Sequence, residues 1–289
     1  LVDAELPCAP YPCPLADSQV ALQRIHRFGE EGGLGPLVRA VKAGDGDTAM
    51  AVLGDTAYPD VTWQVLPENR AGWEQLVQEL AANFAPLIEA ARIGDPESAF
   101  QAYRAFGVLD AMRQGPVGSE ALNRQIEHAL RIRGSIPAGG PWYPGKPVLV
   151  TQNDYRLKLF NGDVGIALPA EGGLKIHFET PDGDYRALTP NRLPAFEAAY
   201  VLTVHKSQGS EYTAVVIPLM TRHYAMLQRN LIYTGVTRGK KLVVLVGQKK
   251  AVAIAVKNVS GRRRWSKLDE WLSDVLSKPF DLKKVSISP

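Results

Sequence analysis

The chain has 289 residues, of which 45% are hydrophobic and 22% charged, with a formal net charge of +3. This length and composition suit one large or two smaller folded domains. No apolar run reaches the roughly eighteen residues that a membrane-spanning helix needs, and the start lacks a secretory signal, so we expect a cytoplasmic protein. Leu1 stands in place of methionine, so we expect a piece of a longer product.

The first thirty residues predict a connector followed by a short helix. Residues 7–14 read Pro-Cys-Ala-Pro-Tyr-Pro-Cys-Pro, which favours an extended conformation. Cys8 and Cys13 are the only cysteines and lack the further ligands of a zinc site, so no metal site is predicted. Asp17 and Ser18 can cap a helix over residues 19–25, and Arg27 follows that helix.

A glycine-rich stretch at residues 30–35 does not have the sequence of a phosphate loop. A Walker A loop requires Gly-x-x-x-x-Gly-Lys followed by Ser or Thr. The Gly-Lys pairs at Gly145 and Gly239 are followed by Pro and Lys. No strand closing on Asp-Glu suggests a Walker B motif either, so the nucleotide-binding machinery in this sequence is incomplete.

The region up to residue 140 predicts mainly helices. Residues 41–60 are polar and contain turns, whereas apolar residues at helical spacing predict one amphipathic helix over residues 73–93. Gly94-Asp-Pro96 should end it and cap the next helix, near residues 97–103. Residues 106–112 predict a strand, and Ser119 is the expected N-cap of a helix that follows, although a phosphate could also bind at that helix start.

Residues 146–193 predict a small β-barrel. Short β-runs at 146–151, 163–168, 174–180 and 185–189 are separated by glycine-containing turns. Trp142, Tyr143 and Phe160 are either core residues at a domain junction or aromatic platforms for nucleic-acid bases.

Residues 200–219 predict strand, polar loop and strand. The loop carries His205, Lys206, Ser207, Gln208 and Glu211, and at the carboxyl end of a buried strand it would form a ligand crevice. A helix over 226–238 should place Arg238 at its C-terminus beside a strand at 242–246.

The C-terminal part is basic. Residues 251–256 predict a helix or a strand, and residues 265–276 an amphipathic helix. Residues 239–289 hold 12 Lys and Arg against 4 Asp and Glu, a net charge of +8 that leaves −5 for the remainder. This segment is either an electrostatic footprint for nucleic acid or a solvated basic end.

Five stretches together resemble the RecD family of superfamily 1 helicases, whose RecD member is the alpha chain of exodeoxyribonuclease V. Residues 203–211, Thr-Val-His-Lys-Ser-Gln-Gly-Ser-Glu, resemble helicase motif V, and residues 233–238, Tyr-Thr-Gly-Val-Thr-Arg, resemble motif VI. Residues 23–29, Gln-Arg-Ile-His-Arg-Phe-Gly, resemble motif IV. Residues 142–150 and 160–166 resemble parts of the inserted domain of this family.

The resemblance implies an α/β fold with a RecA-like parallel sheet covered by helices on both faces, the second motor lobe of such a helicase. It implies that this lobe comprises residues 1–140 and 199–277, that an SH3-like barrel occupies residues 141–198, and that residues 278–289 form a tail. ATP and Mg²⁺ would bind between this lobe and a first lobe that carries the Walker motifs and the metal ligands.

The resemblance also assigns roles to individual residues. Arg238 would be an arginine finger and Arg27 would reach the γ-phosphate of ATP, both as catalytic residues. The remaining assignments are Gln208, Gly209 and Glu211 for the nucleotide, and Thr203, His205 and Lys206 for DNA.

The implied activity is ATP-driven 5′-to-3′ unwinding of DNA in double-strand-break repair and recombination, in a complex with RecB and RecC. Two alternatives stay open. One is a non-catalytic DNA-binding or scaffolding module descended from a helicase lobe. The other is a stand-alone helicase of the same family.

Overall fold

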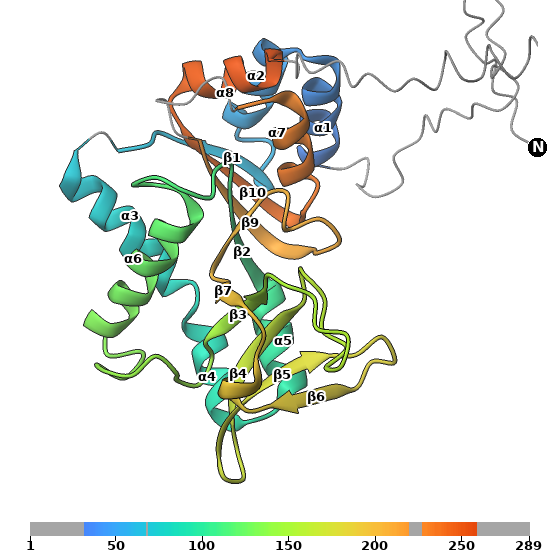
Figure 1. Ribbon diagram of the computed structural model, residues 1–289. Coiled ribbons are helices and arrows are strands. Elements are labelled where there is room, and N and C mark those ends of the chain that lie inside the picture. The colour runs from blue at the N-terminus through green and yellow to red at the C-terminus, as the bar shows by residue number, and fades with distance from the viewer. Residues whose placement is uncertain (1–31, 68, 220–226, 259–289) are drawn as a thin grey trace, which may run out of the picture.

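The structure is a computed structural model that describes residues 32–67, 69–219 and 227–258 (Figure 1). Arg27, both cysteines, the predicted helices over 19–25 and 265–276, and most of the basic C-terminal segment lie outside these residues. Within these ranges, no helix has the length and apolar character needed to cross a membrane.

A parallel sheet forms the centre of the larger part of the molecule. Its strand order is β1-β10-β9-β2-β8, and all four pairings are parallel. The strands are β1 (Val61–Gln64), β2 (Phe106–Asp110), β8 (Val201–Thr203), β9 (Tyr212–Leu219) and β10 (Gly239–Gly247). Valine, leucine and isoleucine dominate the inner strands because both faces of the sheet are buried. Four of these strands match the predicted ones, and β1 was not predicted.

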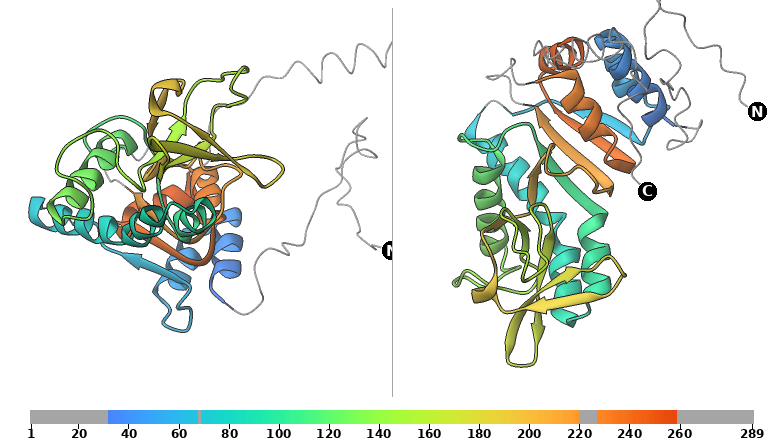
Figure 2. Two further views of the ribbon diagram at one scale, coloured as in Figure 1. Left: turned by 90° about the horizontal axis from the view of Figure 1, so that it is seen from below. Right: turned by 45° about the vertical axis from the view of Figure 1, so that its right-hand side comes forward.

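Helices cover the parallel sheet on both faces, which confirms the predicted α/β class. In Figures 1 and 2, α1 (Leu34–Ala43), α2 (Gly46–Gly54), α7 (Arg229–Val236) and α8 (Lys249–Lys257) gather on one side. The other side carries α3 (Arg70–Ala82), α4 (Ala85–Ile93), α5 (Pro96–Ala105) and α6 (Ser119–Ile132).

The glycine-rich stretch near residue 33 leads into a helix and binds a carboxylate of the chain itself. The backbone N–H groups of Gly33 and Leu34 donate to the two carboxylate oxygens of Asp60, at 2.8 and 3.0 Å. Helix α2 then begins at an N-cap, Asp45, whose carboxylate accepts from Asp47 and Thr48. The prediction of polar turns over 41–60 therefore missed α2 and the last three residues of α1, because both helices are short and separated only by Gly44 and Asp45.

Two predicted helix boundaries were wrong. The helix expected over 73–93 is split into α3 and α4, because Pro86 has no N–H to continue the α3 ladder and instead occupies the first turn of α4. Ser119 is not an N-cap. Gly118 holds that position without a side-chain cap bond, while the Ser119 N–H donates to Met112 O at 2.9 Å. The Gly94-Asp95 stop and cap before α5 are confirmed.

The second sheet is antiparallel, with strand order β6-β5-β4-β3-β7. Its strands are β3 (Pro147–Val150), β4 (Val164–Ala170), β5 (Gly173–Glu179), β6 (Tyr185–Leu188) and β7 (Phe196–Ala198). The four predicted β-runs are confirmed. Strands β6 and β7 lie at the two edges, and the pairings of the described residues do not include one that closes the sheet, so the SH3-like barrel stays a prediction.

The two sheets share one buried core. Leu149, Ile166 and Leu168 of the antiparallel sheet belong to the same buried cluster as the parallel strands. Tyr143 and Tyr200, before and after the antiparallel sheet, are both buried, and their hydroxyl oxygens are 3.0 Å apart. Tyr143 is therefore a core residue and not an aromatic platform for bases. Phe160 is 48% exposed, so it is not part of the core.

Candidate nucleotide and DNA site

The loop at residues 204–211 crosses from one end of the parallel sheet to the other. Thr203 is level with Asp110 at the carboxyl end of the sheet, whereas Tyr212 is level with Gly239 at the amino end. At about 3.3 Å per residue, this separates the two ends of the loop by roughly 20 Å along the strands. The predicted site residues therefore form two groups, and only the first lies at the carboxyl end where we expected the whole loop.

The first group is Thr203, His205 and Lys206. Thr203 is buried, and its Oγ1 accepts from the Lys206 backbone N–H at 3.4 Å. His205 is exposed. Lys206 is paired, with its Nζ 2.6 Å from Glu197 Oε1 on β7. Its ammonium group thus joins the loop to the antiparallel sheet.

The second group is Gln208, Gly209, Glu211 and Arg238. Gln208 is exposed, and Gly209 has a φ of +90°, which explains the glycine in this turn. Glu211 Oε2 lies 2.7 Å from Lys240 Nζ. The loop thus ends in a turn that presents a carboxylate beside the start of β10.

Arg238 joins the end of α7 to this loop. This position agrees with the predicted one, at a helix C-terminus beside a strand. Its guanidinium donates from Nη1 to Ser210 O and from Nε to Thr234 O, each at 3.2 Å. Its backbone O accepts from the Tyr212 N–H at 2.9 Å. Segments 203–211 and 233–238 are therefore bonded directly to each other.

A cavity of about 430 Å³ opens beside this second group, where α5 and the antiparallel sheet approach the loop. Arg104 and Glu179 form an ion pair on its wall, with Nη1 and Oε2 3.0 Å apart. Its lining comprises Phe100, Tyr103, Arg104, Gly162, Asp163, Val164, Glu179, Gly209, Ser210, Glu211, Tyr212 and Lys240. Polar groups of both signs therefore face this space.

Two buried polar residues near the first group were missed by the sequence reasoning. Asp110 ends β2 and is 1% exposed. Its Oδ1 accepts from the Met112 N–H at 2.9 Å, while Oδ2 is buried with no hydrogen-bond partner. Burial raises the pKa of this carboxyl to about 7. In the sequence, the signal for Asp110 was an acidic residue at the end of an apolar strand. Asn123 on α6 bonds the backbone of Val201.

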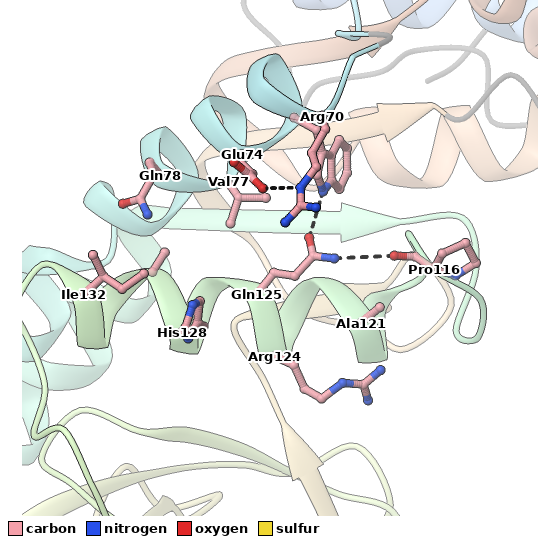
Figure 3. A pocket seen from close by; sticks show the side chains of 12 residues that line it. Arg70, Glu74, Val77, Gln78, Pro116, Ala121, Arg124, Gln125, His128 and Ile132 are labelled. Atoms are coloured by element: carbon pink, nitrogen blue, oxygen red, sulfur yellow. Dashed lines mark hydrogen bonds and ion pairs between the residues drawn. The ribbon is translucent and has the colours of Figure 1, made fainter.

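A second hollow, of about 760 Å³, lies between α3 and α6 and contains none of the predicted site residues (Figure 3). Trp73 Nε1 donates to Gln125 Oε1 across it at 2.9 Å, and Arg70 Nε pairs with Glu74 Oε1 at 2.7 Å. The Trp73–Gln125 bond joins α3 to α6, whereas the Arg70–Glu74 pair lies within α3.

The described side chains supply groups for phosphate but not for a metal ion. A guanidinium anchored by two carbonyls, as in Arg238, keeps a fixed charge and orientation of the kind that suits phosphate oxygens. In the part of the chain that the structure describes, no group of three or more His, Cys, Asp or Glu is placed to hold a metal ion. The Arg238 guanidinium is therefore the described group whose charge and fixed position suit a phosphate.

Comparison with known proteins points to helicases. Residues 198–246 match the family model of the UvrD-like helicase C-terminal domain. The RecBCD enzyme subunit RecD of Mycolicibacterium smegmatis is 36% identical over 241 residues, which are 83% of this chain and 42% of that protein. The ATP-dependent RecD2 DNA helicase of Deinococcus radiodurans is 39% identical over 159 residues, 52% of this chain and 21% of that protein.

Among solved structures, the Pif1 helicase from Bacteroides in complex with ADP-AlF3 and ssDNA matches with a TM-score of 0.39 and 14% identity, over 90% of this chain and 57% of that one. This chain spans less than half the length of the two curated relatives.

Proposed function

Because this chain is a relative of the RecD subunits of RecBCD enzymes, we propose that it forms the second motor lobe of an ATP-dependent DNA helicase. In this proposal, residues 1–140 and 199–277 make the RecA-like lobe, residues 141–198 the SH3-like insert, and residues 278–289 a tail. Unwinding runs 5′ to 3′, and a first lobe supplies the Walker motifs and the Mg²⁺ ligands.

The observation that carries the proposal is the path of the loop at residues 204–211. One short segment reaches from Lys206, beside the carboxyl end of β8, to Ser210, which accepts a hydrogen bond from Arg238 at the amino end of β10. A motor must link its nucleotide to its DNA, and a segment bonded at both ends can transmit a displacement.

At the nucleotide end, Arg238 acts as the arginine finger. Its guanidinium stabilises the charge that develops on the transferred phosphoryl group. Gln208, Gly209 and Glu211 hold the nucleotide, with Glu211 accepting from the ribose hydroxyls. Arg27 serves as a second cation for the γ-phosphate in this proposal. It lies outside the described part of the chain.

At the DNA end, Thr203, His205 and Lys206 contact the backbone of a single strand. A hydroxyl, an imidazole and an ammonium can each donate to phosphate oxygens, and such contacts fix the position of the strand without reading its sequence. In this proposal, the whole protein acts in a complex with RecB and RecC. The complex works in double-strand-break repair and recombination in the cytoplasm.

A stand-alone helicase is the second candidate. The match to the RecD2 helicase, 39% identical over 159 residues, favours it. Both candidates use the same residues of this chain, and copurification of the complete protein with RecB and RecC separates them.

The test of the proposed function is Arg238→Ala in the complete protein. ATP turnover should fall about a thousandfold, the lower end for loss of an arginine finger, while affinity for single-stranded DNA stays within about twofold. Arg133→Ala, at the end of α6, is the control for loss of one arginine. Equal loss of turnover and DNA affinity would contradict the finger role, and steady ATP hydrolysis by this chain alone would contradict the need for a first lobe.

A further inference from the structure

Four charged side chains form a continuous series of ion pairs at the carboxyl end of β2 and β8. Lys206 Nζ lies 2.6 Å from Glu197 Oε1, and Arg113 Nη2 lies 3.4 Å from Glu197 Oε2. Arg113 Nε in turn lies 2.8 Å from Glu120 Oε1, in the first turn of α6. Glu197 belongs to β7, so a carboxylate of the antiparallel sheet sits between two cations of the parallel-sheet loops.

The setting of Glu197 suits a negatively charged group with two acceptor oxygens. Each of its carboxylate oxygens faces a different cation, and Oε2 is buried without a hydrogen-bond partner. A phosphodiester also carries one negative charge shared by two non-bridging oxygens, and Arg and Lys are the side chains that bind it most often. Cations placed to hold the carboxylate can therefore hold a backbone phosphate.

The two cations are accessible from solvent to different degrees. The Arg113 side chain is 54% exposed, while those of Lys206 and Glu197 are 23% and 21% exposed. A strand approaching this end of the sheet would meet Arg113 first and reach Lys206 only when Glu197 moves away. Partial exposure also keeps these ion pairs weak enough to exchange partners.

We propose that Arg113 and Lys206 together bind a backbone phosphate of single-stranded DNA, and that Glu197 occupies this phosphate position in the DNA-free chain. The proposal rests on the proposed function, and it adds Arg113 as a DNA-binding residue and Glu197 as an internal competitor. Binding of DNA exchanges one anion for another, which frees β7 from the Lys206 loop. DNA binding is thereby coupled to the contact between the antiparallel sheet and the loop at residues 204–211.

The test compares Glu197→Gln with Glu74→Gln in the 289-residue chain. Both substitutions remove one negative charge and an ion pair with an arginine, and Glu197→Gln also removes the pair with Lys206. Glu74 lies on α3 beside Arg70, away from the proposed phosphate position (Figure 3). The readout is fluorescence anisotropy of a labelled oligothymidine over a salt series. Glu197→Gln should bind about two- to fivefold more tightly than the wild type, the range expected for removing a partly exposed competing ion pair, and Glu74→Gln should not differ from it.

Substitution of the cations completes the test. Arg113→Ala and Lys206→Ala should each weaken binding and lower the salt slope by about one, and Arg113→Ala in the Glu197→Gln background should abolish the gain. Thermal melting checks that each variant folds. Glu197→Ala replaces Glu197→Gln if the glutamine variant does not fold.

The possible outcomes separate this inference from the proposed function. The Glu197 role is overturned if the wild type binds DNA but Glu197→Gln has no higher affinity, or if Glu74→Gln gains affinity equally. Neither result affects the proposal of a motor lobe. An unchanged affinity in Arg113→Ala overturns the Arg113 role. Absence of DNA binding by all variants overturns both this inference and the DNA contacts of the proposed function, whereas ATP turnover of the complete protein tests the nucleotide end independently.

Discussion

Asp110 is a carboxylic acid that the fold encloses at the end of β2. Its pKa is raised to about 7 because burial removes water from the charged form, which outweighs the hydrogen bonds from the Met112 and Ala111 backbone. The folded state therefore keeps a proton that the unfolded state releases near pH 4. The free energy of unfolding should fall as pH rises from about 4 to about 7, by no more than about 4 kcal/mol at 1.36 kcal/mol per pKa unit, and then level off.

Substitution of Asp110 by asparagine tests this pH dependence. The amide is neutral at every pH and keeps an oxygen for the Met112 N–H, so Asp110→Asn should be more stable than the wild type above pH 7 and should lose most of the slope. Urea unfolding at a series of pH values measures it. Asp182→Asn, in an exposed turn, is the control for loss of a carboxylate. Parallel curves for Asp110→Asn and the wild type would show that the carboxyl is not buried as described.

Among the elements, α6 completes the edge of the parallel sheet. Strand β8 has only β2 as a neighbour, and the Asn123 side chain on α6 takes the place of the next strand. Its Nδ2 donates to Val201 O at 2.8 Å and its Oδ1 accepts from the Val201 N–H at 3.0 Å. This single side chain satisfies both backbone groups of a buried residue, which would otherwise cost free energy to bury.

Replacement of Asn123 by alanine should therefore lower the free energy of unfolding by about 2–4 kcal/mol, because two buried backbone groups lose their partners. Asn83→Ala is a matched control. Each asparagine donates from Nδ2 to the carbonyl four residues earlier, but Asn83 is exposed and bonds Glu79 O alone. Denaturant unfolding of both variants measures the difference, and equal losses would contradict the bridging role of Asn123.

Most elements with periodic or alternating patterns were predictable from the sequence, although the break before Pro86 in residues 73–93 was missed. Elements set by tertiary contacts were not predictable. The β-runs of the antiparallel sheet and the strands around residues 200–219 lie where valine-rich segments and glycine turns placed them. Helix α2 depends on a cap at Asp45 and on packing against α8, which no local apolar period reveals. For the site, the sequence predicted the loop and Arg238, but their bond through Ser210 and the pairing of Lys206 with Glu197 require the fold.

At the scale of the whole molecule, the two sheets are expected to behave as one cooperative unit. Strand β3 turns Leu149 toward the core shared with the parallel sheet, and Val148 and Val150 toward a smaller cluster with Leu159, Ile176 and Phe178. The Tyr143–Tyr200 hydroxyl pair and the bond from Ala199 N–H to Pro147 O join the entry and exit of the antiparallel sheet. In the proposed motor lobe, this shared core would let the parallel sheet and the antiparallel sheet move as one body.

Leu149→Ala tests this unity. Loss of a fully buried leucine should cost about 2–5 kcal/mol and lower the amide-exchange protection of β9 and β10 together with that of β4. Leu159→Ala, an equally buried leucine in the smaller cluster, should lower protection mainly in β4 and β5. If Leu149→Ala left the exchange of β9 and β10 unchanged, or if unfolding showed two separate transitions, the antiparallel sheet would be an independent domain. The proposed coupling between the two sheets would then have to pass through surface ion pairs such as Lys206–Glu197 and Arg104–Glu179.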